Sequence, residues 1–129
     1  MIVVDTSVWV AHFRNDASAK VAALRDLENP NDIIVGDLVL LECLQGARDE
    51  AHAGRMESAL RAFQIEAMLD ASLAIDVARH YRVLRAEGLT PRKTIDLIIA
   101  AFCIKNGHRL LHQDRDFDPM VTHLGLQVL

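Results

Sequence analysis

Residues 2–9 read Ile2-Val3-Val4-Asp5-Thr6-Ser7-Val8-Trp9, and this segment indicates the fold class. Three β-branched apolar residues in a row predict a short buried strand. The strand ends at a run of short polar residues, any of which can cap a helix, and the apolar residues that follow fall at helical spacing. A buried strand that runs directly into a helix is typical of an α/β protein with a parallel sheet.

The rest of the chain continues this alternation. Further strands are expected at residues 33–35, 65–68, 109–112 and 126–129, which makes five with the first. Helices are expected at residues 17–27, 38–44, 48–63, 71–87 and 94–106, and glycines follow the last two. We therefore predict a three-layer α/β fold in which a five-stranded parallel sheet is flanked by helices on both faces.

Composition is that of one globular domain, expected over residues 1–129. Hydrophobic residues make up 51% of the chain, which is enough for one core and argues against disorder. Cys43 and Cys103 lie in apolar helical stretches, where buried thiols are expected rather than a disulfide or a zinc site. The N-terminus has no basic leader and no apolar run is long enough to span a bilayer, so we expect a cytoplasmic protein.

Four acids stand out from the solvated surface. Asp5 and Asp114 follow predicted strands, and parallel sheets bind ligands beyond the carboxyl ends of their strands. Glu42 and Asp96 are each the lone acid in a very apolar helical segment. Taken singly, each acid could be a cap, a turn residue or a partner of a helix dipole.

Together, these acids predict a metal site. Converging carboxylates repel one another, and no Lys or Arg is expected from the local sequence among Asp5, Glu42 and Asp96 to relieve that repulsion. Mg²⁺ or Mn²⁺ with oxygen ligands would do so, and metal-assisted hydrolysis of a phosphodiester is the chemistry that such a site supports. The formal net charge of −4 argues against a nucleic-acid binder, unless several acids belong to a metal site.

Four segments then resemble the motifs of PIN-domain proteins, specifically the VapC toxins of bacterial toxin–antitoxin pairs. They are residues 2–9, 38–46, 95–101 and 110–117, and they occur in the family's order across the chain. The resemblance implies a PIN-like fold and an endoribonuclease that needs Mg²⁺ or Mn²⁺ and cleaves tRNA, rRNA or mRNA. It also implies a homodimer and inhibition by a cognate VapB-type antitoxin.

The same resemblance assigns roles to the acids. Asp5 and Asp96 are expected to bind the metal directly, and Glu42 and Asp114 to complete the catalytic set. Asp116 is a fifth acid nearby, ranked below these four.

Three further residues are additional candidates. Thr6 or Ser7 would hold a carboxylate or the scissile phosphate. His112 departs from the family pattern, because many relatives carry Thr or another small polar residue there. It is either structural or a phosphate contact or proton donor near neutral pH.

Basic residues near the motifs are candidates for gripping RNA phosphates. They are Arg14, Arg92, Lys93 and Arg115. The region 48–63 is a candidate wall of a groove in which an amphipathic antitoxin helix docks.

Two alternatives remain. One is another metal-dependent phosphate-ester hydrolase. A haloacid-dehalogenase-type phosphatase needs a second Asp two places after the first, and Ser7 stands there. The other is a catalytically inactive PIN-like binding module. Such a relative is expected to lack one or more of the acids, and all four are present.

Overall fold

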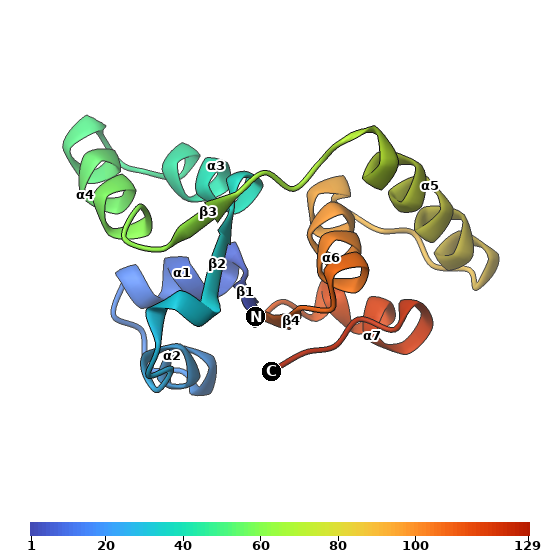
Figure 1. Ribbon diagram of the computed structural model, residues 1–129, viewed down its shortest axis with the longest axis horizontal. Coiled ribbons are helices and arrows are strands. Elements are labelled where there is room, and N and C mark those ends of the chain that lie inside the picture. Colours follow the sequence, from blue (N-terminus) through green and yellow to red (C-terminus); the bar gives the residue numbers. More distant parts are fainter.

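The computed structural model describes residues 1–129 and contains one parallel sheet of four strands. The strands are β1 (Ile2–Val4), β2 (Ile33–Gly36), β3 (Gln64–Glu66) and β4 (Arg109–Leu111). Their spatial order is β3-β2-β1-β4, and all three pairings are parallel (Figure 1). β1 and β2 are buried along their whole length, as their runs of β-branched residues predict.

Seven α-helices surround the sheet, with a short 3₁₀ turn before β2 and another after β4. The helices are α1 (Thr6–Phe13), α2 (Ala19–Arg25), α3 (Asp37–Gln45), α4 (Glu50–Leu60), α5 (Ala71–Ala86), α6 (Thr94–Asn106) and α7 (Asp118–Leu124). The 3₁₀ turns are η1 (Pro30–Asp32) and η2 (Arg115–Phe117). The first six helices confirm the helical pattern of the sequence, whereas α7 was not predicted.

The prediction of a fifth strand at residues 126–129 is wrong. That segment pairs with β4 at a single parallel bridge between Leu110 and Val128. The Leu110 amide donates to the Gln127 carbonyl oxygen, and the Leu129 amide donates to the Leu110 carbonyl oxygen. Leu126 is buried, so its apolar side chain serves the core without forming a strand.

The order of the strands places the helices on two faces. The chain passes from β1 to β2 to β3 in one direction along the sheet and then returns to place β4 on the other side of β1. Because parallel crossovers are right-handed, this reversal moves the later helices to the opposite face. Figure 1 shows α1–α4 on one side of the strands and α5–α7 on the other. The reversal also creates a switch point between β1 and β4, where open parallel sheets bind ligands.

One cluster of 29 buried apolar residues fills the interior. Trp9 is part of it, stacked on Phe13 and tilted against Phe63. Cys43 and Cys103 are free and buried, as expected. No helix combines the length and the apolar composition that a membrane crossing requires.

Candidate metal centre

Two of the predicted metal ligands are among the few polar residues that the fold buries. Asp5 is 4% exposed and Asp96 is 3% exposed, and His112 is the only other buried polar residue. An isolated buried carboxylate is costly unless a cation or hydrogen bonds compensate its charge. The surroundings of these two acids therefore decide what the site can hold.

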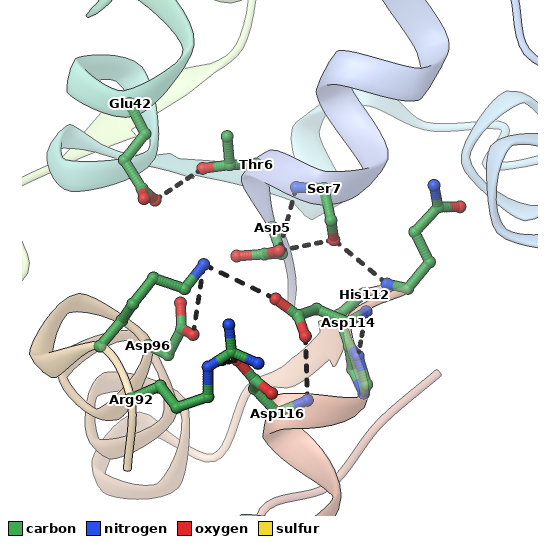
Figure 2. Close-up of polar contacts among 11 residues, drawn as sticks. Asp5, Thr6, Ser7, Glu42, Arg92, Asp96, His112, Asp114 and Asp116 are labelled. Carbon is green, nitrogen blue, oxygen red and sulfur yellow. Dashed lines mark hydrogen bonds and ion pairs between the residues drawn. The ribbon is translucent and has the colours of Figure 1, made fainter. Parts of the chain in front are cut away.

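Asp5 follows β1 and is the N-cap of α1. Capping uses only one of its two carboxylate oxygens, so the other is free to bind a metal ion. Asp5 Oδ2 accepts hydrogen bonds from the Ser7 amide at 3.0 Å and from Ser7 Oγ at 2.6 Å. Oδ1 accepts no hydrogen bond. Figure 2 shows the Asp5 carboxylate turned toward the space that Asp96 and Asp114 also face.

Thr6 and Ser7 each donate a hydroxyl hydrogen bond to a carboxylate, which is one of the two roles considered for them. Thr6 Oγ1 donates to Glu42 Oε1 at 2.8 Å, which ties the start of α1 to α3. Ser7 Oγ also accepts from the Gln113 amide at 3.2 Å and so links the start of α1 to the segment after β4. These bonds bring together acids that lie far apart in sequence (Figure 2).

Asp96 lies in the first turn of α6, and its environment fits a cation. Its Oδ2 is buried and has no hydrogen-bond partner. Burial raises the pKa of Asp96 to about 6; Lys93 opposes that rise, while Asp5, Asp114 and Glu42 add to it. Figure 2 shows the side chains of all four predicted acids gathered in the same region.

The tightest group of acids differs from the predicted pair. Asp96, Asp114 and Asp116 each offer one carboxylate oxygen, and these oxygens lie within 4.8 Å of one another. Asp116, ranked below the other acids from sequence, joins because Asp114 Oδ1 accepts the Asp116 amide at 2.9 Å at the start of η2. The two-residue spacing of these acids was the signal for this pairing.

Lys93 corrects the expectation that no basic side chain sits among the acids. Its Nζ lies 3.7 Å from Asp96 Oδ2 and 3.7 Å from Asp114 Oδ2. Asp96 raises the pKa of Lys93 most, burial opposes this, and Asp114, Glu42 and Asp5 raise it further. Lys93 caps α6 three residues before Asp96, so its long side chain reaches the carboxylate.

The other predicted RNA contacts divide into two groups. Arg92 is an exposed neighbour of the acids, with Nε 4.0 Å from Asp116 Oδ2. Arg115 is also exposed and, with Arg92 and Asp116, lines a depression of about 130 Å³. Arg14 instead follows the last turn of α1, roughly 13 Å along the helix from Asp5, and lines a groove against α3 and α4.

His112 is placed for a structural role. Its Nδ1 accepts the Asp114 amide at 3.2 Å, and its ring packs against Phe117 at a centroid distance of 4.9 Å. Burial lowers the pKa of His112, although Asp5 opposes the shift, so the neutral ring is favoured. The side chain thus braces the loop that carries Asp114 and is poorly suited to donate a proton.

Known proteins resemble the chain over nearly its whole length. Residues 2–120 match the model of the PIN domain family. Ribonuclease VapC11 from Mycobacterium tuberculosis is 33% identical over 132 aligned positions, which cover 98% of this chain and 96% of that relative.

Solved structures share the fold at lower identity. The structure of VapBC2 from Rickettsia felis, bound to a DNA fragment from its promoter, matches with a TM-score of 0.80 at 19% identity, covering 100% of this chain and 98% of that one. VapC20 from Mycobacterium tuberculosis, described as a toxin that cleaves the sarcin-ricin loop, gives 0.67 at 23% identity, covering 92% and 93%. With a family match over most of its length and acids gathered at the switch point of its sheet, the chain belongs to the PIN domain family, with VapC ribonucleases among its relatives.

Proposed function

We propose that this protein is the toxin of a type II toxin–antitoxin system, a single PIN domain that acts in the cytoplasm as a divalent-metal-dependent endoribonuclease. One observation carries the proposal: five carboxylates converge at the switch point of the sheet, and two of them are buried. The relatives named as VapC ribonucleases support RNA as the substrate class.

Each acid would contribute to ion binding in a different way. Asp96, Asp114 and Asp116 supply the compact group of oxygens, and Asp5 faces the same space with Oδ1. Glu42 is oriented by Thr6 and completes the negative site from the α3 side. A bound Mg²⁺ or Mn²⁺ would lower the pKa of a water molecule and stabilise the charge that develops on the phosphate.

RNA would approach along the exposed basic residues beside the acids. Arg92 and Arg115 line one depression there, and Lys93, which is half exposed, lies beside Asp96 and Asp114. Their side chains would bind the phosphates on either side of the bond that is cleaved. Which RNA is chosen would depend on the shape of this surface and on unstacked bases.

The cognate antitoxin would dock in the groove between α1, α3 and α4. This groove, of about 310 Å³, has an apolar floor and a basic rim, and its lining includes Val10, Phe13, Arg14, Cys43, Arg48, His52 and Met56. Such a lining fits an amphipathic segment with acidic side chains. Residues 48–63, which were expected to form one wall of the antitoxin groove, include α4, and α4 would be that wall.

A homodimer would use the other side of the molecule. An apolar groove of about 440 Å³ runs between α5 and α6, lined by Leu69, Val77, Tyr81, Leu97 and Ile98 among others. Leu69 and Tyr81 in this lining are 49% and 41% exposed, and a second copy of the chain would cover them. Light scattering on the purified chain, with and without the substitution Tyr81→Glu, would measure this association.

The decisive experiment is cleavage of total bacterial RNA by the wild type and by Asp5→Asn, with Mn²⁺, Mg²⁺ or EDTA. We expect metal-dependent cleavage by the wild type, a loss of at least about a hundredfold in Asp5→Asn, and new ends with 5′-phosphate and 3′-hydroxyl groups. Asp16→Asn is the matched control, because Asp16 is exposed and its side chain makes no hydrogen bond or ion pair.

Each alternative has its own outcome in this assay. Ends with a 2′,3′-cyclic phosphate would contradict a hydrolytic water, because they require attack by the RNA's own 2′-hydroxyl. Metal-dependent hydrolysis of a small phosphate ester without RNA cleavage would favour the other hydrolase. Folded, antitoxin-free protein that cuts neither substrate under any condition would favour the inactive binding module.

A further inference from the structure

Lys93 is the basic residue that lies beside two of the clustered acids. Its ammonium lies 3.7 Å from a carboxylate oxygen of both Asp96 and Asp114, while the only other Lys or Arg within 4.0 Å of the clustered acids, Arg92, reaches Asp116 alone. The ammonium therefore sits against two of the three residues that form the compact oxygen group. The two carboxylates hold the ammonium at this position, although the Lys93 side chain is half exposed.

Asp96 supplies the second observation. Its side chain is 5% exposed, and its Oδ2 receives no hydrogen bond from the protein. Lys93 is the only cation beside that oxygen, at a distance longer than a hydrogen bond. The ammonium therefore partly balances the charge of the buried Asp96 carboxylate but does not fill its hydrogen-bonding capacity.

A divalent ion bound by Asp96 and Asp114 could not be accommodated with the Lys93 ammonium in its present position. Mg²⁺ binds carboxylate oxygens at about 2.0–2.1 Å, so an ion held by Asp96 and Asp114 would lie within a few ångströms of Nζ. Like charges at that separation repel strongly. Lys93 is able to leave, because its side chain is 51% exposed and is carried on a flexible four-carbon stem.

We propose that Lys93 is a built-in competitor of the divalent metal: its ammonium balances Asp96 and Asp114 in the metal-free protein and must withdraw from them when the ion binds. Lys93 thereby stabilises the metal-free fold and weakens metal affinity. This role rests on the proposed metal centre, and it raises the free metal concentration at which the site is half occupied.

The test is calorimetric titration of Mn²⁺ into the metal-free full-length chain, with the unfolding temperature in EDTA measured in parallel. Lys93→Gln should bind Mn²⁺ roughly tenfold more tightly than the wild type and unfold at a lower temperature in EDTA. Lys93→Arg keeps the charge and should stay close to the wild type. Lys105→Gln is the control, because Lys105 lies at the other end of α6, bonded to Ser72 Oγ at 3.0 Å, and should change neither value.

The outcomes separate this inference from the proposed function. Equal or weaker Mn²⁺ binding by Lys93→Gln, with normal binding by the wild type, overturns the competitor role and leaves the metal centre intact. An unchanged unfolding temperature in EDTA also overturns it, because the inference requires both effects. Absence of Mn²⁺ binding by every variant removes the metal centre and the competitor together.

Discussion

The buried carboxylate of Asp96 lowers the stability of the metal-free fold at neutral pH. This carboxylate is buried in the first turn of α6 and has only one partly compensating cation, Lys93. Burial raises the pKa of Asp96 from 3.8 to about 6, so the folded protein holds this proton more tightly than the unfolded chain does. Stability from this group is present below pH 4 and is lost as the pH rises to about 6.

Asp96→Asn should therefore stabilise the metal-free protein while abolishing metal-dependent cleavage. Above pH 6 we expect a gain of about 1–3 kcal/mol in the free energy of unfolding, because the buried charge is gone. Near pH 4 the gain should vanish, since the wild-type carboxyl group is then protonated in the fold. Urea unfolding in EDTA at both pH values measures this, and a variant less stable than the wild type at pH 7 would contradict it.

The junction between β2 and α3 positions Glu42 through close packing. Gly36 ends β2 and is the N-cap of α3, the helix that carries Glu42. A Cβ at Gly36 would lie 2.9 Å from Cγ and 2.7 Å from Cε of Met68, which is itself buried. Met68 is also held by its amide, which donates to Asp37 Oδ1 at 3.1 Å. Because Met68 is buried, its side chain would have to repack within the core to relieve this contact.

Two glycine substitutions should have opposite signs for this reason. Gly36→Ala should destabilise the fold by about 1–3 kcal/mol, because it overpacks the space that Met68 fills. Gly54→Ala should stabilise by about 0.5–1 kcal/mol, because Gly54 lies within α4 and its Cβ would meet no atom within 4 Å. Thermal unfolding of both variants checks the pair, and equal changes would show that the Met68 contact does not matter.

The proposed metal centre uses residues from distant parts of the chain. Asp5 follows β1, Glu42 lies in α3, Asp96 in α6, and Asp114 follows β4. Only the folded protein brings them together, so an ion bound there should stabilise the whole molecule by linkage.

Mn²⁺ should accordingly raise the unfolding temperature of the wild type. At a free concentration one hundred times the dissociation constant, the expected gain is about 2.7 kcal/mol. Asp96→Asn should show no comparable shift, although it is the more stable protein in EDTA. Scanning calorimetry of both proteins with Mn²⁺ and with EDTA measures this. An equal shift in the variant would place the bound ion elsewhere.

The sequence by itself determined the alternation of strands and helices, the early strand that precedes Asp5, and the four candidate acids. These features depend on neighbours a few residues apart, where periodicity and capping act, so a local pattern is enough to predict them. The resemblance in four ordered segments then pointed to the PIN domain family, which the family match confirms.

Only the tertiary structure decided which side chains meet. The reversal of strand order brings Asp5 and Asp114 to one edge, Lys93 turns in among the acids, and Asp116 joins the closest group. Arg14 is carried away from them to the far end of α1, and residues 126–129 form one bridge instead of a fifth strand. Such outcomes depend on strand order, side-chain reach and the filling of the core. Those are properties of the packed chain, which short-range patterns do not specify.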